Sequence, residues 1–333
     1  MASRIEADRQ LILETQDKGG MAKLGVYTRL SGPGWLQSAI TLGGGSLSGA
    51  LFLGVLGGSD MLWLQMMAII MGVVMLSAIS HVTLSTGKRP FGMINQHINP
   101  ALGWAWLLAT ITANMIWCMP QFGLCFEALE KNLIGFGNTD AYKLAVAGGD
   151  KMYAYKIIIS AIFLTLAGFL VYLSSKKGRA ATVFDWTLKI MVAIVVLAFF
   201  GVVITLTMKD RLEWGAIFSG FIPDFSQWTS PAGASAEKIS GFTQEIADFW
   251  STRVVQTQRD VMIGAAATAV GINMTFLLPY SMLARGWDKP FRGLARFDLS
   301  TGMAIPYVLV TSCVVIAAGA MFNGDLPKDE LFG

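Results

Sequence analysis

The chain has 333 residues, of which 54% are hydrophobic and only 14% are charged, and its mean hydropathy is +0.55. Soluble domains are about 25% charged, so this composition predicts a polytopic membrane protein. The sequence shows no phosphate loop, no zinc-ligand spacing and no nucleophile with a base, so an enzyme is the least expected class. The net charge of +3 is too small and too dispersed to indicate a nucleic-acid partner.

Seven stretches are apolar and long enough to cross a bilayer, because a spanning helix needs about 20 mostly apolar residues. In chain order they are 33–57, 60–84, 101–128, 154–174, 181–208, 261–284 and 300–322. Residues 1–30 are polar and predict a cytoplasmic tail without a cleavable signal peptide. Lys and Arg concentrate in this tail and after the second, fourth and sixth stretches. They predict a cytoplasmic N-terminus, in a bacterial inner membrane or another cellular membrane.

The first stretch is interrupted near its middle by T-L-G-G-G-S-L-S-G-A (41–50). A glycine inside a helix costs about 0.5–1 kcal/mol relative to alanine, so three in a row predict a break. Broken backbone at membrane depth is tolerated only where protein or a water-filled cavity surrounds it. We therefore expect this break to face the bundle interior, and glycines that only permit close helix packing are the alternative.

The sixth stretch is interrupted as well, by Gly264, Gly271 and Pro279. Asn273 and Thr275 bring polar groups to the middle of the membrane there. Four stretches lie between the first and the sixth, so these two run in opposite directions. This pattern is typical of inverted five-helix repeats, in which two discontinuous helices hold the substrate. It predicts an all-α membrane helix bundle of that kind.

The longest connection, 209–258, is predicted to lie on the outer side. Phe242, Ile246 and Phe249 recur there at helical spacing, which predicts a short amphipathic surface helix, either a gate element or packing over the bundle. The predicted domains are the tail (1–30), a first repeat (31–208), this loop (209–258) and the first two helices of a second repeat (259–333). Two complete repeats need ten helices, so we expect either a fragment of a longer protein or a shortened second repeat.

Several short motifs resemble the NRAMP divalent-metal transporters. They are G-P-G-W-L (32–36), the interruption at 43–46, L-W (62–63), T-G-K (86–88) and N-L-I-G (132–135). The resemblance implies a LeuT-like fold of two inverted five-helix repeats, with a metal site between the two discontinuous helices.

The chain departs from that family at the metal ligands. The family's Asp-Pro-Gly-Asn aligns with Gly43, Gly44, Gly45 and Ser46, and its Met-Pro-His aligns with Val270, Gly271 and Ile272. The acidic residues of the family's proton pathway are absent from W-C-M-P-Q-F-G-L (117–124). The remaining neutral oxygens suit a largely hydrated Mg²⁺, which gives up its waters reluctantly, better than a bare Mn²⁺.

We expect backbone carbonyls at the two interruptions, with neutral side chains, to hold the substrate. The predicted substrate-binding residues are Gln37, Thr41, Gly43, Gly44, Gly45, Ser46, Val270, Gly271, Asn273 and Thr275, and the metal positions among them are Gly43, Ser46 and Asn273. Candidates for a gate or proton site are Asp185, Lys189, His81 and Asn114. Structural roles are the alternative for these four: an i, i+4 ion pair, an interfacial hydrogen bond and a helix–helix contact.

The sequence thus predicts an NRAMP-related membrane transporter for a Mg²⁺-like or Mn²⁺-like ion, with weak or no proton coupling. One alternative is a permease for a small organic solute such as an amino acid, whose carboxylate would meet backbone N–H groups. Another is a membrane scaffold or sensor that transports nothing. No cofactor is expected. The expected partners are a small ion or solute and the lipid bilayer, and a homo-oligomer is left open.

Overall fold

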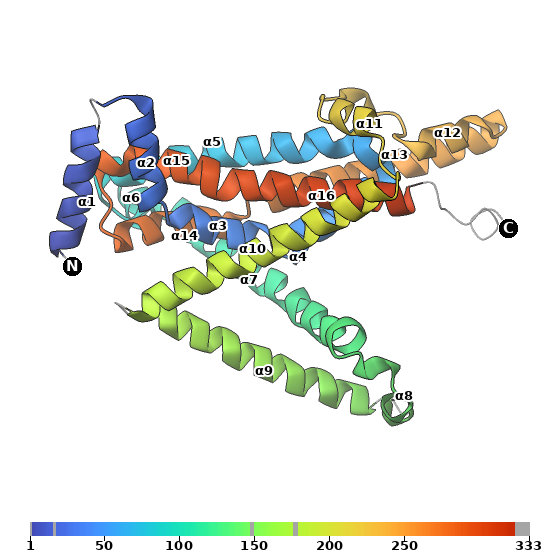
Figure 1. Ribbon diagram of the computed structural model, residues 1–333, viewed down its shortest axis with the longest axis horizontal. Coiled ribbons are helices and arrows are strands. Elements are labelled where there is room, and N and C mark those ends of the chain that lie inside the picture. The colour runs from blue at the N-terminus through green and yellow to red at the C-terminus, as the bar shows by residue number, and fades with distance from the viewer. Residues whose placement is uncertain (1, 16–17, 147–149, 176–178, 324–333) are drawn as a thin grey trace. The chain divides into compact units, whose positions relative to one another are not determined.

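A computed structural model describes the chain except for residues 1, 16–17, 147–149, 176–178 and 324–333. The regular elements of the described residues are all helical, which confirms the predicted all-α class. The chain forms two compact units: residues 1–103 with 188–333 make the large unit, and residues 104–187 make the small unit. Figure 1 traces both units in chain order.

All seven predicted membrane stretches are helical. They correspond to α3 (Pro33–Thr41) with α4 (Gly44–Gly57), α5 (Leu62–Thr86), α7 (Pro100–Glu127), α9 (Asp150–Ser175), α10 (Arg179–Met208), α13 (Gln244–Ala269) with α14 (Ile272–Ala284), and η6 (Leu299–Ala304) with α16 (Ile305–Phe322). Within the described residues, six continuous stretches are long and apolar enough to cross a membrane. The first of these covers 43 residues, Gly44–Thr86, and joins α4 to α5 through the short turn η1 (Gly58–Met61). The protein is an integral membrane protein.

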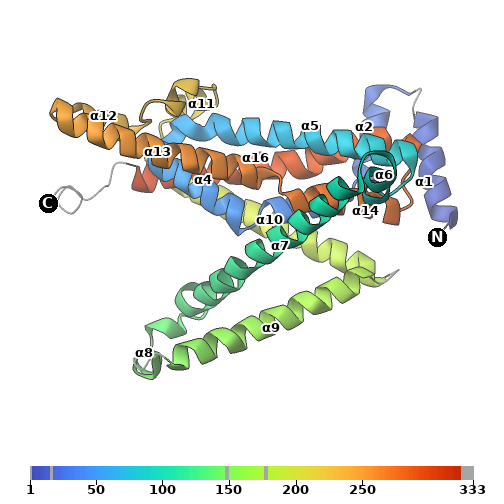
Figure 2. The same cartoon turned by 180° about the vertical axis from the view of Figure 1, so that it is seen from behind.

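Helix α16 lies between α4 and α5 in the large unit (Figures 1 and 2). The approach of α4 to α16 depends on Gly54, because a Cβ atom there would lie 2.4 Å from the carbonyl oxygen of Val315. On the other side, the hydroxyl of Tyr307 donates to Gln65 Oε1 of α5. Both contacts are buried, so α16 forms the centre of the apolar core.

The long connection packs against the ends of α5 and α13. It contains α11 (Trp214–Ser219), η4 (Phe225–Trp228) and α12 (Ala234–Ser240). Gln227 is its buried anchor: its Oε1 accepts from Trp63 Nε1 (3.0 Å), and its Nε2 donates to the carbonyl of Asp60 (3.0 Å). Gln258 of α13 adds a hydrogen bond to the carbonyl of Ser230 (3.1 Å). These amides satisfy loop backbone groups that would otherwise be buried without partners.

The prediction of a separate, short amphipathic helix in this connection is wrong. Ile246 and Phe249 lie in the first turns of α13, which continues without interruption to Ala269. The polar run S-T-R-V-V-Q-T-Q-R-D (251–260) contains neither glycine nor proline, so nothing local ends the helix there.

The residues predicted as a tail form two helices, α1 (Ala2–Thr15) and α2 (Gly20–Leu30). Helix α1 docks beside η5 (Lys289–Phe291), because Arg9 pairs with Asp288 at 2.6 Å and Ile12 is buried. Two further short helices belong to the large unit, α6 (Pro90–His97) and α15 (Arg292–Asp298). The cytoplasmic position of this end, the LeuT-like fold and the inverted repeat stay predictions.

The small unit has an aromatic cluster beside the end of α7. The connection there is built from η2 (Ala128–Leu133), η3 (Phe136–Asn138) and α8 (Asp140–Val146). The ring of Tyr142 lies 5.1 Å from that of Phe136 and 5.4 Å from that of Tyr155, and its hydroxyl donates to Glu130 Oε1 at 2.7 Å. Burial, with Glu130 second, raises the pKa of Tyr142 to about 12.

Candidate substrate site at two interrupted helices

The first predicted interruption is present between α3 and α4. Leu42 is the C-cap that follows α3, and Gly43 takes an extended conformation (φ −81°, ψ 175°) before α4 begins at Gly44. Gly43 occupies the N-cap position, where it has no side chain to accept from the first turn of α4. The interruption therefore leaves carbonyls at the end of α3 and N–H groups at the start of α4 without intrahelical partners.

The second interruption has the same form. Val270 and Gly271 are both extended between α13 and α14, with ψ angles of 102° and 158°. An apolar residue followed by an N-cap glycine thus separates the two half-helices in each case. Here Asn273 Oδ1 accepts from the N–H of Met274 (2.9 Å), so this side chain is occupied by a local hydrogen bond.

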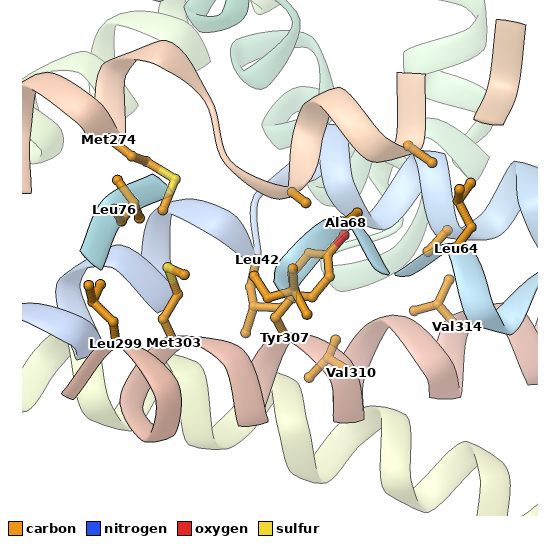
Figure 3. Packing of buried hydrophobic residues seen from close by; sticks show 14 of the residues in the cluster. Leu42, Leu64, Ala68, Leu76, Met274, Leu299, Met303, Tyr307, Val310 and Val314 are labelled. Carbon is orange, nitrogen blue, oxygen red and sulfur yellow. The ribbon is translucent and has the colours of Figure 1, made fainter. Parts of the chain in front are cut away.

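The two interruptions are adjacent and antiparallel. Before the first, Thr41 Oγ1 of α3 lies 3.4 Å from Met274 Sδ of α14; after it, Ser46 Oγ of α4 donates to the carbonyl of Thr268 in α13 (2.8 Å). As residue numbers rise on one interrupted helix they fall on the other, which confirms the predicted opposite directions. Figure 3 shows Leu42 and Met274, from these two helices, in one buried cluster with Tyr307.

A small-residue contact brings a third helix to the second interruption. A Cβ atom on Gly72 of α5 would lie 2.1 Å from Val270 Cγ2, so the Val270 side chain lies directly against the α5 backbone. Gly49 of α4 similarly approaches Ala265 of α13. Close approach of this kind is what small residues allow between membrane helices. Gly49 and Gly72 therefore permit close helix packing beside the two interruptions.

The start of α3 is held by a buried carboxylate. Asp298, only 1% exposed, accepts from the backbone N–H of Gly32 (3.1 Å) and of Gly34 (2.5 Å) and from the hydroxyl of Ser31. The negative charge lies at the positive end of the α3 dipole, which is favourable. Gly34 has no room for a side chain, since a Cβ atom there would lie 2.2 Å from the carbonyl oxygen of Asp298.

The interruptions bring together most of the predicted substrate-binding residues. Thr41, Gly43, Gly44, Gly45 and Ser46 come from one helix, and Val270, Gly271, Asn273 and Thr275 come from the other. Gln37 lies one turn before Thr41 on α3 and is fully buried. Thr275 Oγ1 donates to the carbonyl of Ile272 (2.6 Å). In the described residues no group of three or more His, Cys, Asp or Glu side chains could hold a metal ion.

The gate and proton candidates belong to other helices than the two interrupted ones. His81 is exposed near the end of α5, where its Nε2 lies 3.4 Å from Arg292 Nη1. Asn114 belongs to the small unit and donates to the carbonyl of Thr110 in its own helix (3.0 Å). Lys189 lies in α10, and the side chain of Asp185 falls outside the described part of the structure. Their roles stay predictions.

Sequence reasoning missed Asp298 and the pair formed by Gln65 and Tyr307. Asp298 precedes the seventh predicted stretch, and its partners Ser31, Gly32 and Gly34 belong to the quoted G-P-G motif and its preceding serine. Gln65 is buried in the first turn of α5, within an apolar sequence. A lone amide in such a stretch is the signal that could have identified it.

An all-α membrane bundle with two adjacent, antiparallel, interrupted helices is typical of secondary transporters. A family model described as "Natural resistance-associated macrophage protein-like" (Nramp) matches residues 34–330, and the chain belongs to this family. Its members are membrane metal-ion transporters. The chain matches none of the curated proteins and none of the solved structures with which it was compared.

Proposed function

We propose that the protein carries a divalent metal ion of the Mg²⁺ or Mn²⁺ type between its two interrupted helices. The observation that carries this proposal is the adjacency of the interruptions, fixed on either side by the contacts of Thr41 with Met274 and of Ser46 with Thr268. Carbonyls at the ends of α3 and α13 supply neutral oxygens there. Family membership supplies the class of cargo.

The ligand chemistry favours an ion that keeps much of its water. Neither T-L-G-G-G-S (41–46) nor T-A-V-G-I-N-M-T (268–275) contains a carboxylate or a histidine. Mg²⁺ keeps several waters when it binds and can be held through them, whereas direct coordination of a dehydrated ion calls for charged or more numerous oxygens. Mg²⁺ is therefore the preferred cargo of this site, and Mn²⁺ the weaker one.

The same residues carry no group that titrates near neutral pH, so transport has weak or no proton coupling. The test is uptake of Mg²⁺ and of Mn²⁺ into proteoliposomes, with and without an imposed pH gradient. Mg²⁺ uptake should exceed that of protein-free liposomes and change less than about twofold with the gradient. Flux of both ions equal to that of empty liposomes would overturn the proposal and favour the scaffold or sensor.

A permease for a small organic anion is the second candidate. Both N-cap glycines lack capping side chains, so N–H groups in the first turns of α4 and α14 are uncapped at the positive ends of their dipoles, apart from the Met274 N–H, which donates to Asn273 Oδ1. Thermal-shift measurements with amino acids and small organic acids separate the two candidates, because only a bound ligand raises the melting temperature. A rise with an organic acid but not with MgCl₂ or MnCl₂ would replace the metal by that solute.

A further inference from the structure

The buried face of α3 is polar, while its partly buried face is apolar. Gln37, Ser38 and Thr41 are at most 1% exposed, whereas Trp35 and Ile40 are only partly buried. Burying amide and hydroxyl groups is unfavourable unless they find partners. Polar side chains that face the interior of a membrane bundle generally mark a substrate pathway or a helix contact.

Gln37 stands out because its whole carboxamide lacks a hydrogen-bond partner. Neither Oε1 nor Nε2 bonds another group, and the Oγ of neighbouring Ser38 is unpartnered too. Within the described residues, no other side chain has two polar atoms that are both buried and unpartnered. A serine hydroxyl can turn toward a carbonyl of its own helix, but a glutamine amide with both ends unsatisfied requires a partner from outside it.

The position of Gln37 connects it to the interruption. Thr41, one turn later on the same face, contacts Met274 of α14. Gly34, almost one turn earlier, is hydrogen-bonded to Asp298. Asp298 is already engaged by the start of α3, where its two oxygens accept from Ser31, Gly32 and Gly34. The unpartnered amide thus lies between the anchored start of α3 and the interruption.

We infer that Gln37, together with Ser38, forms a second position for the cargo, one helical turn from the interruption. On the proposed function, the occupant of this second position is a hydrated divalent cation. The oxygens of the Gln37 amide and the Ser38 hydroxyl accept hydrogen bonds from metal-bound waters, and the Gln37 NH₂ group donates to a further water. Because Gln37 and Ser38 are uncharged and bind the ion through its waters, they do not replace those waters as metal ligands. They therefore favour Mg²⁺, which retains its waters, over Mn²⁺. Gln37 is therefore a residue that determines ion specificity.

The test compares Gln37→Leu, Gln37→Glu and wild type in two assays. One is Mn²⁺ binding to the purified protein, followed by electron paramagnetic resonance, with Mg²⁺ as competitor; the other is proteoliposome flux. Gln37→Leu, which keeps the volume but removes the polar atoms, should weaken Mg²⁺ competition and raise the half-saturating Mg²⁺ concentration about tenfold. Its melting temperature should be unchanged or higher, because the unsatisfied amide is gone. Gln37→Glu should retain binding and shift the preference toward Mn²⁺.

A matched pair of serines controls for the loss of a buried, unpartnered hydroxyl. Ser38→Ala should weaken Mg²⁺ binding, whereas Ser312→Ala should not, because the Ser312 hydroxyl is equally unpartnered but lies in α16.

If wild type binds Mn²⁺ without transporting either ion, the proposed function fails, and loss of binding in Gln37→Leu still supports this position. If Gln37→Leu binds and transports both ions as wild type does, the position is wrong even though the proposed function stands. If wild type binds neither ion, both are overturned.

Discussion

The hydroxyl of Ser46 donates to the carbonyl oxygen of Thr268 over 2.8 Å and joins the first turn of α4 to the last turn of α13. It is a side-chain hydrogen bond between the two interrupted helices. The carbonyl is one of those that a helix end leaves without an intrahelical partner. The serine hydroxyl therefore helps to hold the two interruptions together.

Replacing Ser46 by alanine should lower the free energy of unfolding by about 1 kcal/mol, because the Thr268 carbonyl loses its partner. Reversible unfolding in mixed micelles measures the change. Ser48→Ala is the matched control, since its hydroxyl donates only to Gly45 within the same helix. Equal stabilities of the two variants would contradict a role for the Ser46 bond.

Replacing Gly34 or Gly264 by alanine should change the free energy of unfolding in opposite directions. At Gly34 the new Cβ would lie 2.2 Å from the Asp298 carbonyl oxygen, so backbone must shift, and we expect a loss of about 1–3 kcal/mol. At Gly264, in α13, nothing lies within 4 Å of the new atom, and we expect a gain of about 0.5–1 kcal/mol from helix propensity. Thermal unfolding of both variants in one detergent gives the comparison, and a common sign would be evidence against the packing at Gly34.

Substituting asparagine at Asp298 should loosen the start of α3. The asparagine side chain has an NH₂ group in place of one carboxylate oxygen. This donor would face a second donor, the Ser31 hydroxyl or a backbone N–H, and the lost hydrogen bond costs about 1–3 kcal/mol. Trypsin should then cut faster after Arg29, which precedes α3. Asp260→Asn, on an exposed part of α13, provides the control. Cleavage of Asp298→Asn at the wild-type rate would mean that the carboxylate is not needed to hold α3.

Tyr142 should titrate near pH 12. Burial and the hydrogen bond to Glu130 favour the neutral phenol in the folded protein, whose pKa is therefore above the unfolded value of about 10. The stability that this provides is complete below pH 10 and is lost as the pH rises through 12. The ultraviolet difference titration of wild type against Tyr142→Phe isolates this phenol. Glu130→Gln should lower its pKa, and an unchanged titration would show that Glu130 has no part in the shift.

Gly43→Asp should convert the site to one that binds Mn²⁺ more tightly. The backbone of Gly43, with φ −81°, accepts a side chain, although Ile40 O lies 3.1 Å from the new Cβ. Aspartate is a favourable N-cap and supplies the charged oxygen that the site lacks. We expect the half-saturating Mn²⁺ concentration to fall at least about tenfold in proteoliposome uptake. Gly43→Ala adds the carbon without the charge, and equal affinities of the two variants would place the ion elsewhere.

The helix interruptions could be predicted because their causes are local. Three consecutive glycines at 43–45 and the glycine at 271 weaken a helix wherever they occur. The length of α13 could not be predicted in the same way. Its first turns look like a separate amphipathic helix, but the following polar segment continues as helix, and α13 as a whole packs against α4 and α5.

The sequence by itself determined the membrane class, the helical stretches and the opposite directions of the two interrupted helices, because apolar length, glycine runs and the number of crossings need no tertiary contacts. Only the tertiary structure decided which polar groups are satisfied. Asp298 lies more than 260 residues from the N–H groups it binds, while Gln37, on the adjoining turn of α3, is buried without any partner. Hydrogen bonding depends on distances between segments far apart in the chain, and residue order does not contain those distances.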